Sequence, residues 1–165
     1  MSAGLLIIRL VVGLGLAAHG AQKLFGWFGG GGLDATAGVM EHMGFRPGRA
    51  NAFAAGLGEF AGGLLFAAGL ITPLAAAIIV GVMVNAGLVH FANGYFATKG
   101  GYEYTLTIGA AAAAVALTTA GNWSLDHALG LDFSAVGWGI GAIALGLVAG
   151  AARAATRQPA PVPVA

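Results

Sequence analysis

The sequence contains no cysteine and few charged residues. Without cysteine the chain has no disulfide, no thiolate nucleophile, no thiol redox relay and no thiolate-ligated zinc or iron–sulfur cluster. Charged side chains make up 8% of the 165 residues, whereas a typical soluble domain has roughly 25%. Too few groups are available to solvate a water-facing surface, which excludes a soluble globular protein. The seven basic residues are scattered singly, so the chain also lacks the basic patch of a nucleic-acid partner.

Apolar and small residues fill the space that charged residues leave. Hydrophobic residues account for 58% of the chain, and another 30 residues are glycine. The glycines follow no three-residue period, which excludes collagen. Small residues allow apolar helices to approach closely in lipid. Composition therefore predicts an all-α fold, a single compact helical bundle in a membrane.

Five apolar stretches have about the 20 residues that a helix needs to cross a bilayer core of about 30 Å. They predict transmembrane helices over residues 3–25, 50–72, 73–92, 103–120 and 134–152. The first four form a predicted four-helix bundle, and the last is a C-terminal fifth helix whose crossing stays open.

Two further segments complete the predicted organisation. A short interfacial helix is expected over residues 33–45, after the first span. Residues 1–152 then form a single polytopic membrane domain, and residues 153–165 form a disordered, proline-containing tail.

Basic residues gather on one side of the membrane if all five stretches cross it. That side holds Lys23, Arg46, Arg49, Lys99, Arg153 and Arg157. Because basic loops stay in the cytoplasm, this distribution predicts a multi-pass cell-membrane protein with cytoplasmic basic loops. Arg9 is interpreted as a snorkelling or packing charge near the opposite interface.

An acidic residue within the second span is the clearest functional signal. Glu59 lies about 13 Å below the predicted entry of its span, and His19 lies roughly 9 Å from the same membrane face. We therefore expect the two side chains to meet. Lys23 follows His19 by four residues and so lies on the same stripe of the first helix. Gly62 and Gly63 are expected to leave a recess beside Glu59.

Other polar residues come to the same end of the bundle from the third and fourth spans, namely His90, Glu103 and Tyr104. We predict Glu59 and His19 as proton-transferring catalytic residues, with a cofactor or substrate bound by Lys23, His90, Glu103 and Tyr104. No metal ion is expected, since the spacing of these residues does not independently support one. Haem is not expected, because His19 and His90 differ in depth. The structural alternative is a buried polar network that only holds the helices in register.

Further polar residues inside the spans are expected to form interhelical hydrogen bonds. They are Asn85 and the threonines at positions 105, 107, 118 and 119.

Several ordered motifs resemble one family of small membrane proteins. They are Arg9 to Gly13, His19 to Phe28 with the glycines that follow, Gly58 to Gly63, His90 with Asn93 to Phe96, and Gly101 to Tyr104. Together, over about residues 5–126, they resemble the DoxX family. The resemblance implies a four-helix membrane core and points to His19, Lys23, Glu59, His90 and Glu103. The fifth apolar stretch and the tail lie outside it.

The resemblance also implies a link to redox complexes. Some relatives are described as subunits of thiosulfate:quinone oxidoreductase, and others as membrane partners of superoxide dismutase and a sulfurtransferase in oxidative-stress defence. Many members have no established activity.

The leading hypothesis is a quinone-linked membrane subunit of a redox or oxidative-stress system, in which a quinone is the suspected cofactor. One alternative is a non-catalytic scaffold that docks soluble redox enzymes at the bilayer. Another is a transporter of protons or a small solute. Catalysis by the chain itself stays open, as does a homo-oligomer formed through the glycine pairs Gly137/Gly141 and Gly146/Gly150.

Overall fold

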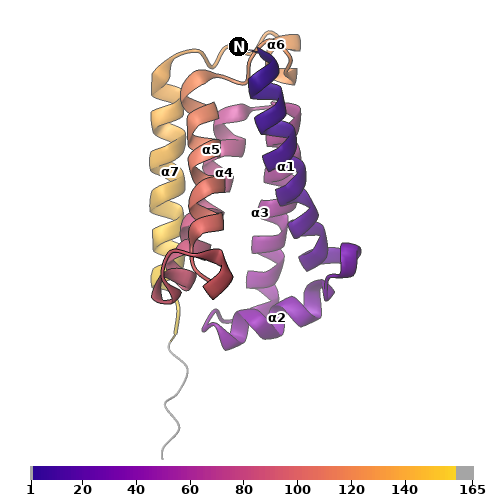
Figure 1. Cartoon of the computed structure of the whole chain (residues 1–165), viewed down its shortest axis with the longest axis vertical. Coiled ribbons are helices and arrows are strands. Elements are labelled where there is room, and N and C mark those ends of the chain that lie inside the picture. The colour runs from indigo at the N-terminus through magenta and orange to yellow at the C-terminus, as the bar shows by residue number, and fades with distance from the viewer. Residues whose placement is uncertain (1, 159–165) are drawn as a thin grey trace, which may run out of the picture.

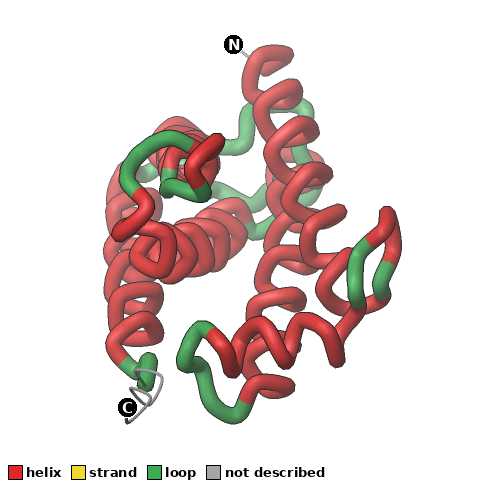
Figure 2. The backbone as a smooth tube through the Cα atoms, turned by 60° about the horizontal axis from the view of Figure 1, so that its bottom comes forward, coloured by secondary structure: helices red, strands yellow, loops and turns green. Residues whose placement is uncertain are grey.

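A computed structural model describes residues 2–158 of the chain. Within that range every regular element is a helix, so the predicted all-α class is confirmed (Figures 1 and 2). Residues 159–165, most of the predicted proline-containing tail, lie outside the described residues.

The helices follow one another with short connections. They are α1 (Ser2–Phe25), η1 (Trp27–Gly29), α2 (Gly32–His42), α3 (Gly48–Ala68), α4 (Thr72–His90), η2 (Phe91–Asn93), η3 (Ala97–Lys99), α5 (Glu103–Thr118), α6 (Leu125–Ala128) and α7 (Val136–Ala155).

Four helices are long and apolar enough to cross a membrane, and they are α1, α3, α4 and α7. The short helix is α5, whose 16 residues span only about 24 Å. The fifth apolar stretch is thus a full-length helix, whereas the fourth is the shorter one. Because α7 ends at Ala155, the first three residues of the predicted tail are helical.

Small residues bring α7 against α4, which lies in the centre of the bundle. Gly146 and Gly150 face α4 so closely that an added Cβ would lie 2.7 Å from the Ala77 carbonyl oxygen and 2.5 Å from that of Gly81. Gly137 and Gly141 have no neighbour within 4 Å of such a Cβ. One glycine pair therefore packs within the chain, and the other faces outward. The main core cluster collects buried side chains of four helices, namely Leu16, Phe66, Ala75, Ile79, Val80, Met83, Ile108, Ala112 and Val115.

The two ends of the bundle differ in charge. Figure 1 places α6 and the start of α1 at one end, and α2 with the end of α1 at the other. The end that carries α2 collects the six basic residues named above, whereas the connections 69–71 and 119–135 at the other end contain no lysine or arginine. The helix directions thus match the charge bias expected from the sequence.

A buried network closes the end that carries α6. The Arg9 side chain donates to the carbonyl oxygens of Ala120, Ala67 (3.4 Å) and Trp123 (2.6 Å), and the residue is 1% exposed. Of the two interpretations given for Arg9, the structure contradicts snorkelling and agrees with a packing charge. Sequence reasoning did not foresee that these carbonyls, left free where helices end, would provide its partners.

Asp126 shapes the turn between α3 and α4 at the same end. Its carboxylate accepts hydrogen bonds from the Ile71 amide (2.6 Å), the Thr72 amide (3.0 Å) and the Thr72 hydroxyl (2.5 Å). Ile71 has a φ of 46°, which is unfavourable for a β-branched residue. The carboxylate compensates by satisfying the amides that this turn exposes.

Candidate functional site

Glu59 lies near the middle of α3 and forms an ion pair with Lys23 of α1. The Glu59 side chain is 6% exposed and the Lys23 side chain 31%. The predicted partner of Glu59 was His19, but the structure places Lys23, one turn further along α1, against the carboxylate. Gly20 makes this approach feasible, since a Cβ there would lie 2.6 Å from the Gly56 carbonyl oxygen of α3.

Only one oxygen of the Glu59 carboxylate is satisfied. Lys23 binds Oε1, whereas Oε2 is buried and has no hydrogen-bond partner among residues 2–158. A buried acceptor without a partner costs about 1–3 kcal/mol, and more when it is charged. An atom in this state is either a cost of folding or a place for a ligand's hydrogen-bond donor.

His19 lies one turn before Lys23 on α1, and its ring contacts Tyr104 of α5. Their rings meet edge to face with centroids 5.6 Å apart. Both side chains are exposed. We call Lys23, His19, Glu59 and Tyr104 the α1–α5 seam.

The predicted recess beside Glu59 is filled by neighbouring helices. A Cβ on Gly62 would lie 2.8 Å from Cγ2 of Ile78, and one on Gly63 would lie 2.5 Å from the Gly13 carbonyl oxygen. These glycines allow α1 and α4 to pack against α3, so the space they leave is occupied by protein. The recess predicted from these two glycines is therefore absent beside Glu59 among residues 2–158.

His90 and Glu103 take other positions at the same end of the bundle. Glu103 Oε2 accepts a hydrogen bond from the Ala97 amide (2.9 Å) and so holds the loop between α4 and α5. His90 ends α4 half-buried. Within the described part of the chain, no hydrogen bond or ion pair joins either residue to Glu59. Nor do any three His, Asp or Glu side chains there form a group that could hold a metal ion.

Among residues 2–158, the expected interhelical hydrogen bonds of the span residues do not form. Thr105, Thr107 and Thr118 donate to carbonyl oxygens within a turn of their own position, at 2.8, 2.9 and 2.9 Å. Thr119 accepts from the amide of Gly121 (3.3 Å). Asn85 Oδ1 is buried and has no hydrogen-bond partner in the described part of the chain. Threonine satisfies itself on the backbone of its own helix, so its presence in a span did not require a partner helix.

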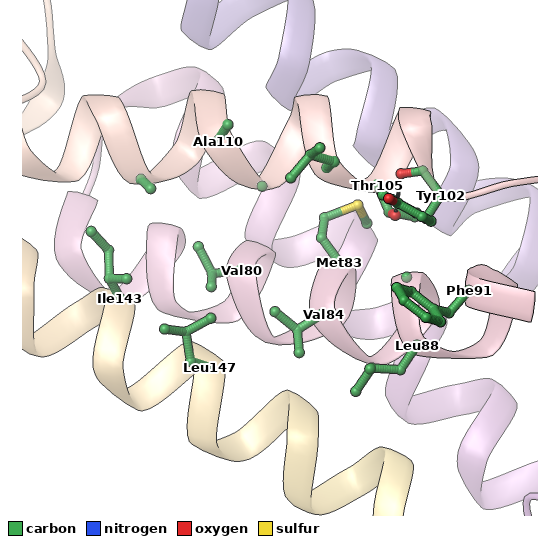
Figure 3. A pocket seen from close by; sticks show the side chains of 14 residues that line it. Val80, Met83, Val84, Leu88, Phe91, Tyr102, Thr105, Ala110, Ile143 and Leu147 are labelled. Atoms are coloured by element: carbon green, nitrogen blue, oxygen red, sulfur yellow. Dashed lines mark hydrogen bonds between the residues drawn. The ribbon is translucent and has the colours of Figure 1, made fainter. Parts of the chain in front are cut away.

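Two sizeable cavities lie elsewhere in the bundle. One, of about 360 Å³, is walled by α4, α5 and α7. Figure 3 shows Val80, Val84 and Leu88 of α4 along it, with Ile143 and Leu147 of α7 beside them. The other, of about 420 Å³, lies between α3, α4 and α7. No residue of the α1–α5 seam lines either cavity.

Comparison with known proteins places the chain in a family. The family model described as DoxX matches residues 4–92, which include α1, α3 and α4 with Lys23 and Glu59. The match ends before α5 and Tyr104. No curated protein and no solved structure matches the chain. Because the family match spans just over half of the 165 residues, the chain belongs to the DoxX family.

Proposed function

We propose that the protein is the quinone-binding membrane subunit of a redox complex and that the quinone head group binds at the α1–α5 seam. The observation that carries this proposal is the unpartnered Oε2 of buried Glu59 beside the Lys23 ammonium. A buried ionisable residue in a membrane helix is a functional candidate by default. His19 and Tyr104 are exposed, and we propose that a lipid-dissolved head group enters beside them.

The seam offers both kinds of hydrogen-bonding group that the two redox states of a quinone need. An oxidised quinone has only acceptor oxygens, which match the Lys23 ammonium and the Tyr104 hydroxyl. A hydroquinone has hydroxyl donors, and an ionised carboxylate is an acceptor only. Oε2 of Glu59 is therefore the acceptor for a hydroxyl of the hydroquinone, so the seam has partners for both redox states.

Reduction of a quinone to a hydroquinone consumes two electrons and two protons. We infer that a partner oxidoreductase docked at the membrane supplies the electrons. The chain supplies the proton route. His19 exchanges protons with the surroundings of the bundle, and Glu59 exchanges protons with the ligand. By the positive-inside rule the end with α2 faces the cytoplasm of the cell membrane, so the partner docks there.

Hydroquinone binding to the purified protein tests this proposal. A short-chain hydroquinone is titrated into protein in lipid nanodiscs under reducing conditions. We expect saturable binding that Glu59→Gln weakens about ten-fold, because a charge-assisted hydrogen bond contributes about 1.5–3 kcal/mol. Glu103→Gln is the matched control, since that carboxylate holds a loop, and it should leave binding unchanged.

Binding that does not saturate, or that Glu59→Gln leaves unchanged, would contradict the proposal. The scaffold hypothesis would then be favoured, and pull-down from native membranes with mass spectrometry would identify the docked enzyme.

A further inference from the structure

The cavity between α3, α4 and α7 is separate from the α1–α5 seam. Its volume is about 420 Å³, within the range of ligand pockets. Leu74, Ile78 and Val82 of α4 form its floor, and Ala54 of α3 and Leu145 of α7 line its sides. We call it the α3–α4–α7 groove.

The groove is long, apolar and open at the side. It reaches from Leu74 to Asn85 along α4, a distance of about 16 Å for eleven steps of 1.5 Å. Ala54, Leu145 and Ala149 line it and are exposed, so in a membrane it faces the lipid. A hydrocarbon chain entering from the bilayer fits this form.

The end of the groove near α2 is polar and basic. Arg153 lines it with its guanidinium over the Phe45 ring, 5.2 Å from the centroid. Within residues 2–158 the charge of Arg153 has no acidic partner, and its side-chain hydrogen bond goes to the Thr156 hydroxyl (2.5 Å). An anion at this end would therefore gain a cation that no carboxylate neutralises.

Asn85 adds an acceptor at the same end. Its Oδ1 is buried and finds no hydrogen-bond partner within the described residues, and the residue lines the groove. Asn51 also lines the groove, but its amide is bound to the Pro47 carbonyl oxygen (2.7 Å). This end of the groove thus has two features that a ligand could satisfy. Arg153 provides a cation for an anion, and Asn85 provides an acceptor for a hydrogen-bond donor.

We propose that the α3–α4–α7 groove is a specific site for an anionic phospholipid whose head group carries a free hydroxyl. One acyl chain lies along α4, the phosphate binds Arg153, and a head-group hydroxyl donates to Asn85 Oδ1. Basic pockets between membrane helices on the cytoplasmic side recognise anionic head groups in this way. The site is separate from the α1–α5 seam and does not depend on quinone binding.

Native mass spectrometry of the full chain tests the proposal. The detergent-solubilised protein is mixed with equal amounts of phosphatidylglycerol and phosphatidylcholine that carry identical acyl chains. We expect the first bound lipid to be phosphatidylglycerol with about ten-fold preference, the size of one charge-assisted contact. Arg153→Gln should abolish the preference. Arg46→Gln, which removes an exposed charge at the same end, should retain it.

A second variant separates the groove from the bilayer surface. Ala149→Phe places a ring in the groove mouth and should reduce binding of both lipids, with the helical circular dichroism and thermal midpoint as the check on folding. Equal binding of the two lipids, meaning ordinary boundary lipid only, would overturn the proposal. So would a preference that survives Arg153→Gln in folded protein. Neither result would alter hydroquinone binding at Glu59, so failure of one proposal is distinguishable from failure of the other.

Discussion

The ion pair between Lys23 and Glu59 should respond asymmetrically to loss of either partner. Lys23→Met leaves a carboxylate that is 6% exposed with neither oxygen bound. Removing one partner of a buried pair costs about 3–5 kcal/mol, and we expect about 3 kcal/mol because Lys23 is itself 31% exposed. Glu59→Gln should cost about 1 kcal/mol. Lys23, two residues before the end of α1, can then extend its ammonium to the interface.

The double variant Lys23→Met/Glu59→Gln determines the coupling between the two side chains. Because it leaves no unpaired charge, we expect a total cost of about 2 kcal/mol, half of the roughly 4 kcal/mol sum of the single variants. The coupling energy is then about 2 kcal/mol. The free energy of unfolding is measured by titrating the denaturing detergent fraction in mixed micelles and following helical circular dichroism.

A small coupling would refute this reasoning. Polar pairs between membrane helices average about 0.6 kcal/mol. A coupling at or below that value, or a cost of Glu59→Gln equal to that of Lys23→Met, would mean that the carboxylate is already solvated and that Oε2 does not lack a partner.

Three further predictions concern packing, the opposite end and topology. Gly63→Ala should destabilise the bundle by about 1–3 kcal/mol in the same assay, because its Cβ would lie 2.5 Å from a backbone oxygen. Gly15→Ala, with no neighbour within 4 Å, should be neutral or stabilise α1; equal effects would contradict the close packing of α1 on α3. Asp126→Asn should cost about 2 kcal/mol more than Asp132→Asn, since Asp126 accepts three hydrogen bonds inside the protein, and equal thermal midpoints would oppose its role. In this cysteine-free chain, a membrane-impermeant thiol reagent should label Asp132→Cys in intact cells and Lys99→Cys only after permeabilisation, and the reverse pattern would invert the orientation.

Composition and apolar length were enough to predict an all-helical membrane protein, because they depend on no long-range contact. A hydropathy pattern does not resolve where α5 and α7 end, because these ends depend on packing against neighbouring helices. At the site, helix periodicity placed His19 and Lys23 on one stripe, but the rotation of α1 against α3 decided which of them reached Glu59. That rotation follows from the contact of Gly13 and Gly20 with α3.

Glycine was the residue whose role the sequence resolved least well. Gly62 and Gly63 beside a buried acid were interpreted as a recess, whereas Ile78 and Gly13 occupy the space. A glycine in a membrane helix marks a close approach, and only the partner helix decides whether the neighbour is protein or ligand. The groove at Arg153 was missed for the complementary reason, since its lining comes from three helices whose register no local motif encodes.

Photolabelling with a light-activated quinone analogue, followed by peptide mapping, tests most directly whether a quinone head binds at the α1–α5 seam. We predict labels on α1 around His19 and on α5 around Tyr104, competed by unlabelled quinone and reduced in Glu59→Gln. Labels confined to α7 or to the α3–α4–α7 groove, or labels that unlabelled quinone does not compete, would contradict a quinone site at Glu59.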